Sequence, residues 1–204
     1  MKKILFCLIL LPSLLICLTS CSGESSTPNV DDPVQKACNT INELLSLKYN
    51  EIWIDVYTQN DNVTLNSKFT VKDKVINYSI EKLSQLPTDG NIDSASPEYI
   101  TKVSGTANIE NGKVVFVNNE TVELPQYSEL SGRFNFAKNN LENVKINDGS
   151  FSATVKNSTL FYGSNVNVKN MSVFVNYNSS TINEIRISYN TENSHVTLNY
   201  YFHK

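Results

Sequence analysis

Histidine and cysteine, which build many catalytic and metal sites, are scarce in this 204-residue sequence. The two histidines, His195 and His203, fall in the last ten residues, and no HExxH motif or Cys/His cluster accompanies them. The nucleophile motif GxSxG is also missing. From these absences we predict no catalytic residue, no metal site and no cofactor, and we expect a protein that is not an enzyme.

Positive charge is not in excess either. Lysine and arginine total 17 against 20 acidic residues, which gives a formal net charge of -3. Loss of Lys2 and Lys3 with a leader segment would bring the charge to about -5, that is -3 minus 2. Because phosphate binding needs a basic patch, we do not expect nucleic acid as a partner.

The first twenty residues read as a secretory signal. Lys2 and Lys3 form a charged start, and an apolar run of about fifteen residues follows from Ile4 to Leu18. That run is shorter than the roughly 20 apolar residues that span a bilayer, so a transmembrane anchor is the weaker interpretation. We therefore expect residues 1–20 to be removed as a signal peptide.

The end of this segment carries a short motif. Leu18-Thr19-Ser20-Cys21 resembles the lipobox of bacterial lipoproteins, in which small residues separate a leucine from an invariant cysteine. The resemblance implies cleavage before Cys21, lipidation of its sulfur with diacylglycerol, and attachment to the cell membrane or the outer membrane with the domain outside the cytoplasm. An ordinary signal peptide with a chance cysteine is the alternative. Residues 21–30 are small and polar and suit a flexible tether.

A helix is expected at the start of the mature domain. Asp32 can cap it, Pro33 suits its first position, and apolar residues recur at spacings of three and four from Val34 to Leu45. We expect about fifteen helical residues, ending between Lys48 and Asn50. With the leader removed and Cys21 lipidated, Cys38 is the remaining thiol; its apolar helix position favours a small buried hydrophobe, and no internal disulfide can form.

Alternation of apolar and polar residues then predicts about ten antiparallel strands, with Asn111-Gly112 as the strongest hairpin turn. A sheet of that size should curl or fold over. We predict one mainly β domain over residues 31–204, with one N-terminal amphipathic helix followed by a large curved antiparallel sheet, as a half-barrel or a sandwich. The expected strands are residues 52–57, 63–69, 76–80, 99–109, 114–117, 134–146, 150–155, 171–177, 181–189 and 195–202.

The order of one helix and then a long meander, in an envelope lipoprotein, resembles the half-barrel lipid carriers of the bacterial envelope. In that family a curved sheet holds acyl chains against helices. The resemblance is one of architecture and assigns no residue a role. It implies a lipid or another amphipathic ligand held in a curved-sheet cavity.

Trp53 and Tyr57 are the candidate ligand contacts. They share one face of an expected strand with Asp55 between them, and an aromatic pair beside a carboxylate can stack on a sugar ring. Because the other face of this strand is also apolar, packing of both rings in the core is the favoured interpretation. We expect a non-enzymatic binding or interaction module for an envelope protein or glycan, with a lipid carrier and an envelope hydrolase as alternatives.

Overall fold

The computed structural model describes residues 32–60, 63–84, 99–117, 125, 127–164, 166 and 168–204. The chain divides into two units, Met1–Val30 and Asp31–Lys204, and the described residues belong to the second. The signal segment, the tether and Cys21 lie outside the described residues, so cleavage and lipidation stay predictions. In the described part, no helix is both long and apolar enough to cross a membrane.

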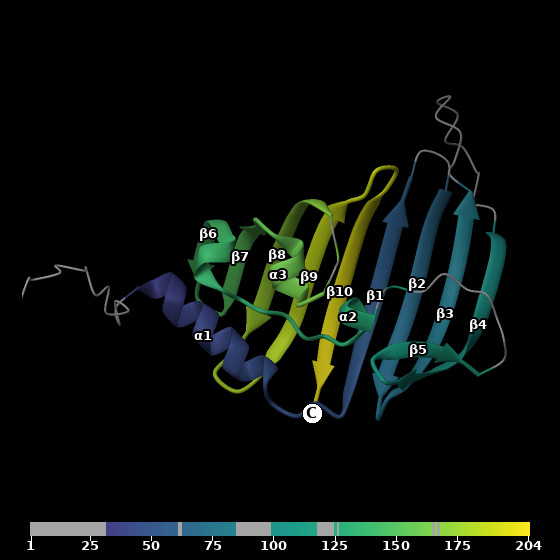
Figure 1. The fold of residues 1–204 in the computed structure, drawn as a ribbon, viewed down its shortest axis with the longest axis horizontal. Helices are drawn as coiled ribbons and strands as arrows, with labels where there is room; N and C mark the ends of the chain where they lie inside the picture. The colour runs from purple at the N-terminus through teal and green to yellow at the C-terminus, as the bar shows by residue number, and fades with distance from the viewer. Residues whose placement is uncertain are drawn as a thin grey trace, which may run out of the picture. The chain divides into compact units, whose positions relative to one another are not determined.

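A single open antiparallel sheet of ten strands forms the domain (Figure 1). Its strand order is β5-β4-β3-β2-β1-β10-β9-β8-β7-β6. The predicted mainly β fold with a curved antiparallel sheet is confirmed, whereas the sandwich alternative is wrong because all ten strands belong to one sheet. The strands are β1 Glu51–Gln59, β2 Val63–Lys72, β3 Val75–Ser84, β4 Tyr99–Glu110, β5 Lys113–Phe116, β6 Leu141–Asn147, β7 Ser150–Val155, β8 Lys169–Tyr177, β9 Ile182–Asn190 and β10 His195–His203.

The first and last strands lie side by side in the middle of the sheet. β1 pairs with β10 along its whole length, from Glu51 opposite His203 to Gln59 opposite His195. On either side the chain runs as a meander, β1 to β5 outward in one direction and β10 back to β6 in the other. The β1–β10 pairing is therefore what joins the two halves of the sheet.

The N-terminal helix α1, Pro33–Leu45, begins as the sequence indicates. The Asp32 carboxylate accepts hydrogen bonds from the backbone N–H of Val34 at 2.9 Å and of Gln35 at 3.3 Å, which caps the first turn. The helix ends earlier than expected because the N–H of Ser46 closes the last turn and its hydroxyl donates to the carbonyl of Glu43 at 2.6 Å. Its buried residues are Ala37, Cys38, Ile41 and Leu44.

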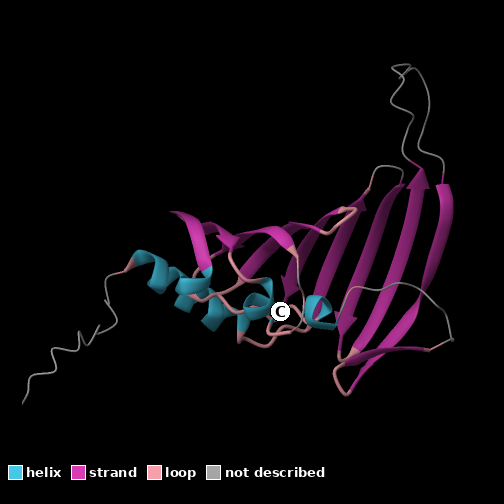
Figure 2. Cartoon of the chain, turned by 45° about the horizontal axis from the view of Figure 1, so that its top comes forward, coloured by secondary structure: helices cyan, strands magenta, loops and turns pink. Residues whose placement is uncertain are grey.

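Helix α1, the short helices α2 (Tyr127–Leu130) and α3 (Ser158–Tyr162), and strand β5 lie over the same face of the sheet (Figures 1 and 2). We call this the inner face. Alternate residues of each strand point into it and form one continuous core with the helices, as Ile54, Ile187 and Tyr200 do. The opposite face of the sheet, which we call the outer face, therefore receives the intervening residues.

Two asparagines fix the segment that crosses from α2 to β6. Asn42 donates its side-chain N–H to the carbonyl of Phe136 at 2.9 Å and accepts the N–H of Phe136 at 3.1 Å. Asn140 makes the same double contact with Asn157, at 2.9 Å in both directions. The strand expected from residue 134 is thus wrong for its first part: this stretch buries two phenylalanines and pairs with a side chain, and β6 begins only at Leu141.

Candidate functional site

Polar side chains cover most of the outer face. In the described part no helix lies over it, and its hydroxyls and amides bond to one another across strands, as Ser188 does with Thr197 at 3.1 Å. The face comprises Trp53, Asp55 and Tyr57 of β1, Asn66 and Lys68 of β2, Asn77, Ser79 and Glu81 of β3, Lys102, Ser104 and Thr106 of β4, Lys145 of β6, Ser152 and Thr154 of β7, Ser172, Phe174 and Asn176 of β8, Glu184, Arg186 and Ser188 of β9, and Thr197, Asn199, Tyr201 and His203 of β10.

Trp53 and Tyr57 lie on this outer face and not in the core. Trp53 is 48% exposed and Tyr57 is 41% exposed. The interpretation that both rings pack in the core is therefore wrong. The reason is that Ile54 and Val56 of the same strand fill the core, and alternation sends the two aromatic residues to solvent.

An aromatic patch forms around Trp53. The ring of His203 packs on Trp53 with 4.3 Å between centroids and a tilt of 50°, and Tyr201 lies directly opposite Trp53 in β10. Tyr57 lies four residues along β1, on the same face. We define the aromatic patch as Trp53, Tyr57, Tyr201 and His203.

The electrostatic surroundings keep the Tyr201 hydroxyl protonated. Partial burial raises the pKa of Tyr201, and the negative charges of Glu184 and Asp55 raise it further, against a smaller opposing effect of Arg186. Like an ordinary tyrosine, Tyr201 is protonated at neutral pH and can donate a hydrogen bond, and the shift extends this state to higher pH. In the same patch, Nε2 of His203 is buried and has no hydrogen-bond partner among the described residues.

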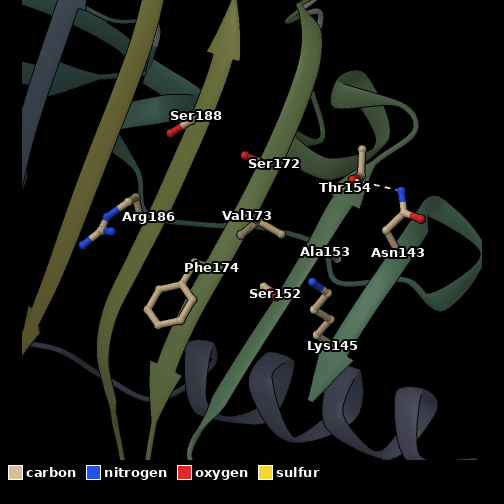
Figure 3. Close-up of a pocket in the computed structure, with 10 residues that line it drawn as sticks. All are labelled: Asn143, Lys145, Ser152, Ala153, Thr154, Ser172, Val173, Phe174, Arg186 and Ser188. Carbon is tan, nitrogen blue, oxygen red and sulfur yellow. Dashed lines mark hydrogen bonds between the residues drawn. The ribbon is translucent and has the colours of Figure 1, made fainter. Parts of the chain in front are cut away.

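A second feature of the outer face is a hollow of about 330 Å³ over β6 to β9 (Figure 3). It exists because small side chains, including Ser152, Ser172 and Ser188, form its floor, while the longer Lys145 and Phe174 rise beside them. We call it the serine hollow. Its lining residues are Asn143, Lys145, Ser152, Ala153, Thr154, Ser172, Val173, Phe174, Arg186 and Ser188.

Arg186 connects the serine hollow to the aromatic patch. Its Nε donates to Asn199 at 3.0 Å, its Nη2 donates to Glu184 at 2.8 Å, and its guanidinium carbon lies 5.9 Å from the centroid of the Phe174 ring. Because all three contacts are near solvent, each contributes little to stability. Together they hold the guanidinium in one orientation between the two features.

A buried polar cluster lies on the inner face, away from both features. Tyr189 donates its hydroxyl to the buried carboxylate of Glu129 at 2.6 Å. Burial, and then the charge of Glu129, raise the pKa of Tyr189 and of Tyr162, and burial above all raises the pKa of Tyr200. These phenols stay neutral, and the hydrogen bond of Tyr189 to Glu129 anchors α2 to the sheet. Nothing in the sequence pattern of a four-residue helix singles out Glu129.

Metal ligands and known relatives are two further signals of function. No group of three or more His, Cys, Asp or Glu side chains in the described ranges is arranged to hold a metal ion. No protein-family model and no curated protein matches this chain. The outer face itself is therefore the feature of the described residues that bears on function.

Proposed function

We propose that this protein is a cell-envelope lipoprotein whose domain is a non-enzymatic binding module for glycan chains. The observation that carries the proposal is the exposure of Trp53 and Tyr57 in the middle of an open sheet face rich in hydroxyls and amides. The signal segment and the lipobox-like residues support the envelope location, with Cys21 as the lipidated residue and the membrane as the first partner.

The chemistry of sugars fits this face. A sugar ring has apolar C–H faces and a rim of hydroxyls, so it takes aromatic rings together with donors and acceptors. Trp and Tyr offer large rigid contact areas at a low entropic cost, and Ser, Thr and Asn both donate and accept. A broad face without a deep pocket suits an extended polymer better than a small molecule.

The two alternatives gain no comparable support in the described residues. A lipid carrier needs an open apolar surface, whereas side chains such as Ile54, Ile185 and Tyr200 of the inner face are buried. A glycoside hydrolase needs a pair of carboxylates facing a cleft. The carboxylates beside the aromatic patch, Asp55 and Glu184, lie on an open sheet face, and Glu184 pairs with Arg186. The buried carboxylate of Glu129 accepts from a tyrosine in the core.

Binding can be tested with the full chain in mild detergent, by affinity electrophoresis against a panel of soluble polysaccharides. We expect Trp53→Ala to weaken binding about tenfold, which corresponds to about 1.4 kcal/mol for a lost stacking surface. Leu160→Ala is the matched control, because Leu160 is 58% exposed on α3, away from the outer face. Equal effects of the two variants would rule out the aromatic patch as the site.

Other outcomes identify other functions. Lipid recovered in stoichiometric amount from the purified chain, with no polysaccharide bound, would favour the lipid carrier. The anchor has its own test: Cys21→Ser should release the chain from membranes after a high-salt wash, because the acyl chains would be lost. A serine variant that stays with the membranes would contradict lipidation.

A further inference from the structure

The serine hollow and the aromatic patch lie on the same face and are close enough for one polymer to reach both. β1, which carries Trp53, is separated from β8, which carries Phe174, by β10 and β9. Three strand spacings of roughly 4.8 Å each place the strand of Phe174, at the near side of the hollow, about 14 Å from the strand of Trp53, and the strand of Lys145 lies two spacings further. An extended glycan chain lying across the strands would therefore pass from the aromatic patch into the hollow.

The hollow differs from the patch in its charge. Its lining contains two cations, Lys145 and Arg186, and no carboxylate, in a chain whose net charge is -3. Arg186 already shares its charge with Glu184. Lys145 is exposed and makes no ion pair among the described residues, and its ammonium group points toward Ser152 at the floor (Figure 3).

We infer that the serine hollow binds a carboxylate-bearing sugar of the bound glycan, with Lys145 as the charge partner of that carboxylate. The inference rests on the proposed glycan-binding function and assigns its substrate class, an acidic polysaccharide. The ring of Phe174 supplies an apolar wall for the sugar. The hydroxyls of Ser152 and Ser172 supply hydrogen bonds to its remaining oxygens.

A β-bulge in β6 sets the direction of the Lys145 side chain. Lys145 follows a β-bulge, since the β6–β7 register shifts between Glu142 and Lys145 and Asn143 adopts a φ of +52°. A bulge redirects the side chains that follow it. Asn143 in turn donates to Thr154 at 3.4 Å, at the rim of the hollow.

Polygalacturonate and its fully methyl-esterified form provide a matched pair of probes, because they share one backbone and differ in charge. With the full chain in mild detergent, we expect the acid form to bind about two- to fivefold more tightly at low salt, the size of one solvent-exposed ion pair. The preference should shrink at high salt, as screening requires. Dextran and dextran sulfate form a second pair, which tests whether sulfate can replace the carboxylate.

Three variants assign the preference to Lys145. Lys145→Gln should bring the ratio of the affinities for the acid and the esterified forms close to one, whereas Lys145→Arg should retain the preference for the acid form. Lys113→Gln removes the same charge from β5, at the far end of the sheet, and should leave the ratio unchanged. Circular dichroism verifies that each variant folds. The inference is overturned if Lys145→Gln keeps the preference, if the wild type binds both forms equally, or if dextran sulfate alone shows a charge effect.

The outcomes also separate this inference from the proposed function. If both polygalacturonate forms bind equally and Trp53→Ala weakens the binding of both as expected, the result supports glycan binding and rules out the charged subsite. If neither form of polygalacturonate binds but neutral glycans do, the assignment of an acidic polysaccharide is wrong, whereas the proposed glycan binding is supported. If no glycan binds, both fall together.

Discussion

At the scale of single residues, Cys38 shows how burial lowers the reactivity of a thiol. Its side chain is fully buried, and burial raises the pKa of the thiol to about 11. At pH 8 only about one molecule in a thousand would then carry the thiolate, which is the nucleophilic form. We expect Cys38 of the folded domain to react with a disulfide reagent at least a hundredfold more slowly than Cys38 of the same protein in denaturant. Rapid labelling of the folded protein would contradict this.

Two glycines allow the cost of backbone strain to be measured apart from the cost of a steric clash. Gly132 and Gly163 both have positive φ, at +62° and +65°. A Cβ on Gly132 would lie 3.0 Å from Cδ1 of Ile52, whereas a Cβ on Gly163 would meet nothing within 4 Å. We expect Gly163→Ala to cost about 1 kcal/mol through strain alone, and Gly132→Ala about 2–3 kcal/mol because overpacking is added. Urea unfolding measures both, and equal losses would show that the contact does not matter.

The face to which a residue points could be predicted only in part. The even spacing of Trp53 and Tyr57 correctly places them on one face of a strand, but Ile52, Ile54 and Val56 of the other face are equally apolar. Which set enters the core depends on the face of β1 that α2 and the segment after it cover, and a local pattern does not contain that position. The serine hollow was missed for a related reason, since it needs four strands in register.

At the scale of elements, the side chain of Asn42 bonds to both backbone polar groups of Phe136, as a neighbouring strand would do. Asn42→Ala would leave both the N–H and the carbonyl of Phe136 without their present partners, and we expect a loss of about 2 kcal/mol because both groups are partly buried. Asn39→Ala is the control on the same helix; Asn39 is exposed, so its loss should stay within about 0.5 kcal/mol. Chemical denaturation of the two variants makes the comparison, and similar losses would refute a specific role for Asn42.

The predictability of elements follows their length and the strength of their local signals. The predicted starts of helix α1 and of strands β1 to β3 agree with the structure to within one residue, because Asp32 caps the helix and each strand alternates clearly. Their predicted ends are less accurate, since α1 ends earlier and β3 extends further. The Asn111-Gly112 turn is confirmed, with φ of +51° and +72°. Helices α2 and α3 were missed because four or five residues give no helical period. Tertiary contacts of their side chains, such as that between Glu129 and Tyr189, hold α2 in place.

At the scale of the whole molecule, the two halves of the sheet depend on one strand pair. The order of the strands in the sheet could not be predicted from the sequence. A meander predicts that strands adjacent in sequence pair, but it does not predict the partners of the first and last strands. In the structure they pair with each other, at the greatest separation the domain allows. Contacts between such distant residues form late and slow folding, so the halves should acquire their final stability together.

Deletion of residues 195–204 tests this dependence. The truncation removes β10, leaves β1 and β9 each with an unpaired edge, and takes four buried side chains out of the core: Val196, Leu198, Tyr200 and Phe202. We expect loss of the cooperative thermal transition and loss of amide protection in both β1–β4 and β6–β9, whereas deletion of Lys204 alone should preserve both. Protection that survives in either half of the truncated chain would mean that this half folds by itself, and that residues 31–204 do not form the single domain predicted from the sequence.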